Sequence, residues 1–147
     1  RSSDLDGSTG KVEIKNVEKI PVVTAFLKHN DRILLVKRGN EVATFKNHWS
    51  GISGYLEREN PLEQALIEIK EETDLDVELI SKGDPILARG EGNIWKVYPF
   101  LFESHGNIEL NWENIEFDWF LPEDIKDLKT VPKLLEAYRS TKEALEG

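Results

Sequence analysis

Apolar and polar positions alternate in the first part of the chain, and this pattern predicts two paired strands. Residues 17–28 alternate and then become β-branched, and residues 32–38 form a second apolar run. Asn30 and Asp31 separate the two runs, which favours a β-hairpin with a short turn. Residues 39–48 break the pattern and predict a loop beside a candidate site.

A short strand is expected at residues 49–56. Its apolar residues are interrupted by three turn-capable ones, Gly51, Ser53 and Gly54. Because small residues leave the backbone accessible, we expect the strand to open into a loop at Ser53 and Gly54 that exposes its carbonyl groups.

Residues 61–73 show helical spacing. Pro61 suits the first helical position, Asn60 suits the N-cap, and Asp74 suits a left-handed residue after the helix. The apolar stripe expected to dock this helix on a core consists of Leu62, Ala65, Leu66 and Ile69.

The second half of the chain predicts further strands at residues 77–81, 86–89, 95–102 and 116–121. A short helix at 122–128 and a final helix follow. The final helix is expected to turn four side chains toward the core, Leu134, Leu135, Tyr138 and Leu145. Several strands around one central helix, with a helical C-terminus, predict an α/β (α+β) fold in which a mixed β-sheet carries helices on both faces.

Three carboxylates share one face of the predicted central helix. Glu68, Glu71 and Glu72 stand at spacings i, i+3 and i+4. The positions that could relieve their repulsion hold Gln64, Ile67 and Asp76. A cation from outside the chain resolves this conflict, and hard oxygen ligands suit Mg²⁺, Mn²⁺ or Ca²⁺. The alternative is a solvated acidic face on an acidic protein.

Composition narrows the classes of partner. The 147 residues carry a net charge of −9, which disfavours binding to nucleic acid or to an anionic membrane. A phosphate-bearing substrate would also be repelled unless metal ions neutralised it. The chain has no cysteine, which excludes disulfides and thiolate sites and is compatible with a cytoplasmic location. His29, His48 and His105 show no metal-ligand spacing.

The longest apolar run, residues 21–27, is too short to span a bilayer, and no signal-peptide pattern is present. We expect residues 1–10 to be a flexible leader and residues 11–147 to form a single domain.

The stretch from residue 49 to residue 75 resembles the box of the Nudix hydrolase family, G-x5-E-x7-R-E-U-x-E-E-x-G-U with U aliphatic. The matching positions are Gly54, Glu59, Glu68, Ile69, Glu71, Glu72 and Leu75. Three positions depart from the box: the turn after Gly54 is one residue short, Ile67 replaces the Arg, and Asp74 replaces the second Gly. In the family that Arg orients a catalytic Glu, so Arg58 or Arg38 would have to replace it, or activity falls.

The segments ISGYLE, WKVYPFLF, INWENIEFDWFLPEDI and TVPKLLEA resemble more closely an archaeal and fungal subgroup of Nudix proteins. Some members of that subgroup are fused to a domain like a translation-initiation exchange-factor subunit.

The resemblance implies an α/β/α sandwich with a central loop-helix-loop. It also implies a MutT-like diphosphohydrolase that cleaves a nucleoside diphosphate linked to another group, with Mg²⁺ or Mn²⁺ as cofactor. Glu68, Glu71 and Glu72 would be metal ligands and catalytic residues, and Gly54 would add a backbone carbonyl. The general base would be Glu72 or Glu68, or a Glu from a later loop: Glu91, Glu103 or Glu113.

Substrate contacts are expected from Arg38, Lys46, Tyr55 and Glu59. Arg38 suits a phosphate because guanidinium binds anions in a bidentate manner. His48 is a further candidate for substrate contact, and Arg89 is a weaker case of the same kind as Arg38. For the aromatic rings of Phe45 and Trp95, we expect packing in the core rather than stacking on a nucleobase.

Two alternative functions make different demands on the sequence. A Nudix-fold nucleotide-binding or regulatory module with little or no turnover is motivated by Ile67 and the short turn. An isopentenyl diphosphate isomerase would imply a catalytic cysteine, which this chain lacks. The Trp- and Phe-rich strands could supply a homodimer interface, and the sequence does not distinguish between diphosphate substrates.

Overall fold

Two long parallel strands form the centre of the fold. The computed structural model describes residues 18–105 and 116–146. β2 (Lys19–His29) pairs in parallel with β8 (Asn93–His105) along almost its whole length. The other edge of β2 pairs with two strands in turn, β5 (Ile52–Tyr55) near its start and β3 (Arg32–Lys37) near its end.

The remaining strands extend this pair on both sides. β6 (Asp76–Lys82) and β7 (Ile86–Gly90) pair with the free edge of β8, whereas β4 (Trp49–Ser50) and β9 (Glu116–Phe120) pair with β3. These pairs are antiparallel, so the eight strands within the described residues form one mixed sheet. The predicted mixed sheet is therefore confirmed.

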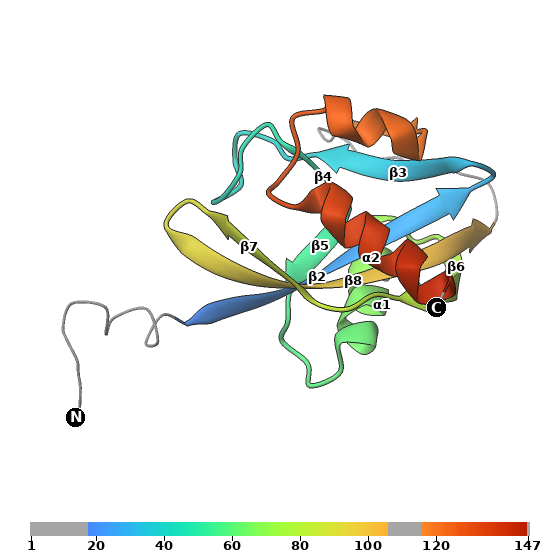
Figure 1. The fold of residues 1–147 in the computed structure, drawn as a ribbon, viewed down its shortest axis with the longest axis horizontal. Helices are drawn as coiled ribbons and strands as arrows, with labels where there is room; N and C mark the ends of the chain where they lie inside the picture. The colour runs from blue at the N-terminus through green and yellow to red at the C-terminus, as the bar shows by residue number, and fades with distance from the viewer. Residues whose placement is uncertain (1–17, 106–115, 147) are drawn as a thin grey trace.

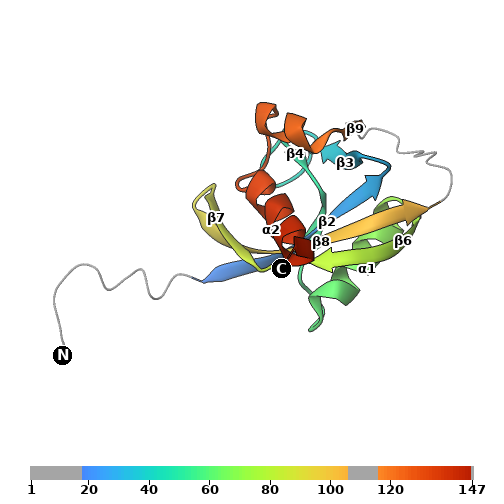
Figure 2. The same cartoon turned by 45° about the vertical axis from the view of Figure 1, so that its right-hand side comes forward.

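Helices cover both faces of the sheet, as Figures 1 and 2 show: α2 crosses one face and α1 lies behind the other. α1 is Pro61–Glu72, α2 is Leu134–Glu146, and a 3₁₀ helix, η2, covers Pro122–Asp127. Alternation along the strands explains the two layers. Leu34 and Val36 join the core under α1, whereas Ile33 and Leu35 join the core under α2.

The start and end of α1 follow the sequence signals. The side chain of Asn60 accepts hydrogen bonds from the backbone N–H groups of Leu62 (2.9 Å) and Glu63 (3.4 Å), as an N-cap should. Asp74 has φ 54°, the left-handed conformation that ends the helix. Its carboxylate forms an ion pair with Lys70 one turn earlier. The predicted ends of this helix are confirmed to within one residue.

Two apolar side chains were wrongly predicted to face the core. Leu66 is 43% exposed on α1, where Gln64 and Ala65 are buried instead. Leu145 is 47% exposed in the last turn of α2, whereas Leu134 and Tyr138 of the same helix are buried.

The single strand predicted at residues 49–56 is divided into β4 and β5 at Gly51. A Cβ at Gly51 would lie 2.8 Å from the carbonyl oxygen of Ala25, so only glycine permits the two backbones to approach this closely. The loop expected at Ser53 and Gly54 was also wrong, because both residues lie inside β5 and pair with β2. The turn follows Tyr55.

Other expectations lie outside the described residues, namely the leader at 1–10, Val17 and the part of the subgroup segment within 106–115. Over the residues that the structure does describe, no helix is long and apolar enough to cross a membrane.

Candidate active site

Two of the three carboxylates predicted to share one face of α1 form a hydrogen-bonded pair. Glu68 and Glu72 lie one helical turn apart on α1, and their side chains hydrogen-bond to each other. We call Glu68 and Glu72 the acid pair. A Cβ at Gly54 would overlap the carboxyl group of Glu68, so this glycine of β5 makes room for the acid pair against the sheet. Helical spacing therefore brings Glu68 and Glu72 together, and the absence of a side chain at Gly54 lets the Glu68 carboxyl group pack against the backbone of β5.

The acid pair holds a proton at neutral pH. Burial raises the pKa of the Glu72 carboxyl to about 8, and the hydrogen bond and negative charge of Glu68 contribute further. The charge of Glu71 adds to the rise, whereas the guanidinium of Arg38 opposes it. Two adjacent carboxyl groups cannot both ionise cheaply, so either a proton or a cation must occupy the space between them.

A divalent cation fits the acid pair. Carboxylate oxygens are the ligands that Mg²⁺ and Mn²⁺ prefer, and a bound cation would supply the positive charge that the raised pKa of Glu72 assigns to a proton. Glu71, the third predicted ligand, is exposed, and residues 18–105 and 116–146 contain no ready-made group of three acidic or histidine ligands. The acid pair would therefore hold the metal, with Glu71 beside it.

Gln64 lies behind the acid pair. Its side chain is 2% exposed, its Nε2 donates to Glu68 Oε2 (2.9 Å), and its Oε1 accepts from the backbone N–H of Glu57 (3.0 Å). From the sequence, Gln64 is one of the uncharged positions that do not relieve the repulsion between the carboxylates. The i, i+4 spacing of Gln and Glu was the signal that could have shown the contact.

A cavity of about 260 Å³ is lined by Gly54, the glycine that packs against Glu68, although neither member of the acid pair lines it. Besides Gly54, the cavity wall includes three aromatic side chains, Phe45, Tyr55 and Trp95. The rings of Phe45 and Trp95 meet edge to face at 5.7 Å between centroids, and Tyr55 stands 6.4 Å from Trp95. Tyr55 is 53% exposed, so its ring can accept a further partner.

The rest of the cavity wall mixes hydroxyl and apolar groups from several strands and loops. The hydroxyl-bearing residues are Thr24, Thr44, Ser50 and Ser53, and the apolar ones are Val22, Ala88, Val97, Val131 and Pro132. Ser53 Oγ lies 3.1 Å from both Thr24 Oγ1 and Ser50 Oγ, so these three hydroxyl groups form one hydrogen-bonded cluster. Sequence reasoning missed these wall residues, because they come from segments that only folding brings together.

Arg38 connects the acid pair with the cavity. Its guanidinium lies on the cavity wall, and its charge also acts on Glu72. The loop after β3 holds it in place, since Nε donates to the carbonyl of Thr44 (2.9 Å) and one terminal nitrogen donates to Thr44 Oγ1 (3.2 Å). The guanidinium has donors left over for an anion.

The other predicted contact residues lie away from the cavity wall. Lys46, Glu59 and Arg58 are exposed, and none of them lines the cavity. Arg89 is likewise exposed on β7. Arg58 therefore gives no sign of replacing the box Arg.

The candidate bases outside the box have other partners. Glu91 accepts a hydrogen bond from the backbone N–H of Phe45 (2.8 Å), and Glu103 forms an ion pair with Lys28 (3.6 Å). Glu113 lies outside the described residues. Glu68 and Glu72 are connected to the cavity through Gly54, which lines it and packs against Glu68.

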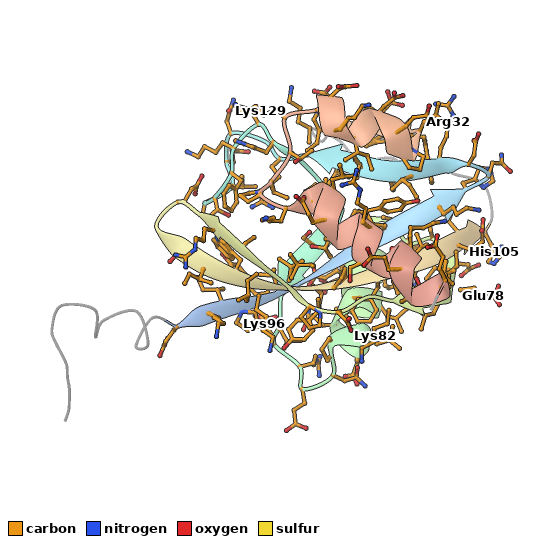
Figure 3. All side chains as sticks on the ribbon, in the orientation of Figure 1. Arg32, Glu78, Lys82, Lys96, His105 and Lys129 are labelled. Carbon is orange, nitrogen blue, oxygen red and sulfur yellow. The ribbon has the colours of Figure 1, made fainter. Side chains whose placement is uncertain are left out.

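The histidines serve local contacts. His105 pairs with Glu78 at the end of β6 and β8 (Nε2 to Oε1, 3.3 Å), and Figure 3 labels both at the edge of the sheet opposite β7. His48 Nδ1 lies 2.8 Å from the carbonyl oxygen of Lys46, and His29 contacts the ring of Trp119.

Known proteins share this architecture. The family model described as the NUDIX domain matches residues 18–140. The solution structure of the E. coli ORF135 protein has a TM-score of 0.66 at 22% identity and covers 87% of this chain and 94% of that one. The MutT protein from Methanosarcina mazei Go1 has a TM-score of 0.65 at 21% identity, covering 86% and 96%.

A third similar structure is the NUDIX domain of Shewanella oneidensis NrtR complexed with ADP ribose. Its TM-score is 0.62 at 17% identity, with coverage of 93% of this chain and 99% of that one. Comparison with curated proteins gives no match. At these identities the solved structures establish the α/β/α fold, and the family model covers most of the sequence. The chain belongs to the Nudix family.

Proposed function

We propose that this protein is a metal-dependent hydrolase that cleaves the diphosphate linkage between a nucleoside and another group. The observation that carries the proposal is the acid pair, packed against Gly54 at the edge of a cavity that also presents Arg38. Carboxylates that can bind a metal and a guanidinium that can bind phosphate thus lie near the same cavity, an arrangement that suits the hydrolysis of a polyanionic diphosphate.

A divalent ion held by Glu68 and Glu72, with Glu71 in support, would neutralise phosphate charge and lower the pKa of the attacking water. Arg38 would donate to phosphate oxygens and hold the diphosphate beside Gly54. Glu68 or Glu72 would take a proton from the water. The water oxygen would then form its bond to phosphorus while the P–O bond of the anhydride breaks. The leaving phosphate departs with the electron pair of that bond.

The cavity favours a nucleoside as one half of the substrate. Its volume of about 260 Å³ and its three aromatic rings suit a nucleobase, because every base can stack on an aromatic ring. Hydroxyl groups of Thr24, Ser50 and Ser53 could hydrogen-bond to base or ribose atoms. The NrtR structure holds ADP ribose, which places that compound first in a substrate panel.

The second candidate is a Nudix-fold module that binds a nucleotide and turns it over slowly or not at all. Ile67 in place of the box Arg, and the exposed position of Glu71, favour this alternative. Subgroup membership and a cytoplasmic location rest on the sequence alone and stay predictions.

One assay separates the two candidates. Release of phosphate or nucleotide is measured from ADP ribose, dinucleoside polyphosphates and nucleotide sugars, with and without Mg²⁺, for the wild type and Glu72→Gln. We expect release from at least one compound that requires Mg²⁺ and is lost in the variant. No Mg²⁺-dependent release across the panel, from a protein that still binds Mn²⁺, would exclude the hydrolase and favour the binding module.

A further inference from the structure

We propose that Gln64 is a positioning residue that orients Glu68 for metal binding, in place of the arginine expected at position 67. The proposal rests on the hydrolase function above. It concerns the contact of a buried neutral amide with one member of the acid pair, which neither the box pattern nor the family match assigns.

The orientation of the Gln64 amide is fixed by its surroundings. The backbone N–H of Glu57 can only donate, so the Gln64 oxygen must face it (3.0 Å). The NH₂ group then faces Glu68 Oε2 and donates to it at 2.9 Å. Gln64 is 2% exposed, and a buried amide that lost these partners would leave unpaired polar groups, so one arrangement is strongly favoured.

Glu68 is thereby held from two sides. Gly54 in β5 lies against its carboxyl group, and the Gln64 amide donates to Oε2. Gln64 also ties the segment between β5 and α1 to the helix through Glu57, so the strand, the turn and the helix carry Glu68 as one unit. Fixing a ligand through such partners is how proteins tune metal sites.

The residue at the arginine position makes no such contact. Ile67 is half-buried and has no polar side-chain atom, and the guanidinium of Arg38 donates hydrogen bonds to Thr44. A neutral amide orients Glu68 without cancelling its charge, whereas an arginine would cancel part of it. Gln64 therefore supplies the orientation and leaves the full negative charge for the cation.

The first test compares Gln64→Met with Leu66→Met, a matched control that introduces the same residue at an exposed position of α1. For Gln64→Met we expect kcat to fall about 10- to 100-fold with KM for substrate changed less than about threefold, and the Kd for Mn²⁺ to rise about tenfold. Leu66→Met should match the wild type. If folded Gln64→Met keeps kcat and the Mn²⁺ Kd within about threefold, Gln64 is merely structural and the proposal is overturned.

The second test uses the wild type and does not depend on a variant that folds. Gln64 is the only glutamine in the sequence, so ¹⁵N labelling of glutamine side chains gives one pair of amide signals. We expect substoichiometric Mn²⁺ to broaden this pair beyond detection. Sharp signals in a protein saturated with Mn²⁺ would overturn the proposal.

The two proposals can fail separately. A wild type that hydrolyses no compound but binds Mn²⁺, more weakly after Gln64→Met, loses the proposed function and keeps the positioning role. Mg²⁺-dependent hydrolysis that Gln64→Met leaves unchanged keeps the function and removes the positioning role.

Discussion

The acid pair and the aromatic cavity lie side by side, but they arise in different ways. Glu68 and Glu72 come from one turn of one helix, so helical spacing alone brings them together. The cavity takes Phe45 from a loop, Tyr55 from β5 and Trp95 from β8. In this fold, the charged half of the site is local in sequence, whereas the half that would select the substrate is assembled by tertiary packing.

The difference also concerns energy. Burial, together with the neighbouring Glu68 carboxyl group, raises the pKa of Glu72 to about 8, so a proton or a cation is needed to stabilise the acid pair. The aromatic part of the cavity wall is held by contacts between neutral groups: the rings of Phe45 and Trp95 meet, and the Trp95 indole N–H donates to the carbonyl of Gly90 (3.2 Å). Changes in the acid pair should therefore alter kcat and metal binding, and changes in the cavity should alter KM.

The largest expected effect is that of Glu72→Gln on turnover. Removing one of two paired metal ligands should lower kcat at least about 100-fold, equivalent to roughly 2.7 kcal/mol of barrier. The control is Glu63→Gln on the exposed first turn of the same helix. A loss below about tenfold, measured under saturating Mg²⁺, would show that Glu72 is not a catalytic ligand.

The next effect is on stability against pH without metal. Because the pKa of Glu72 is about 8 in the folded state and near 4.5 ordinarily, unfolding releases a proton between these values. The contribution of Glu72 is thus fully present below pH 4.5 and is lost as pH rises through 8, roughly 2–4 kcal/mol in all.

Glu72→Gln lacks this contribution. Urea unfolding of both proteins in EDTA should show the wild type losing stability relative to the variant from pH 5 to pH 8.5. Parallel curves for the two proteins would contradict the strained acid pair.

A smaller effect is expected in the cavity. Tyr55→Ala should raise KM about tenfold and leave kcat within about twofold, because a stacked base contributes roughly 1–3 kcal/mol of binding. The control is Leu87→Ala, which removes a side chain of similar exposure on β7 away from the cavity. A Tyr55→Ala variant in which kcat falls and KM does not change would contradict the assignment of KM to the cavity and of kcat to the acid pair.

The smallest effect is expected from Ile67→Arg. With Gln64 already orienting Glu68, restoring the box residue should change kcat less than about threefold. In the Gln64→Met background the same substitution should recover at least about fivefold. A large gain in the wild-type background would mean that Glu68 is poorly oriented as it stands.

Much of this site could be predicted from sequence, and the missed parts share a physical cause. The mixed sheet, the ends of α1 and the proximity of Glu68 to Glu72 follow from patterns along the sequence. Small residues at positions 53 and 54 predict a loop. Both residues instead pair with β2, at Thr24 and Val23, and a pairing between residues so far apart in the chain cannot be seen in a local pattern. The sequence shows Gln64 only as a residue without charge beside the carboxylates, because its contact with Glu68 also depends on the backbone N–H of Glu57, which fixes the direction of the amide.

The central claim is that Glu68 and Glu72 hold a divalent cation, and a Mn²⁺ titration followed by electron paramagnetic resonance tests it most directly. At pH 7.5 the wild type should bind Mn²⁺ at one tight site, and the double variant Glu68→Gln/Glu72→Gln should bind it at least about tenfold more weakly, since carboxamides are poorer ligands for hard cations. Equal affinity and stoichiometry in the two folded proteins would place the metal elsewhere and contradict the account.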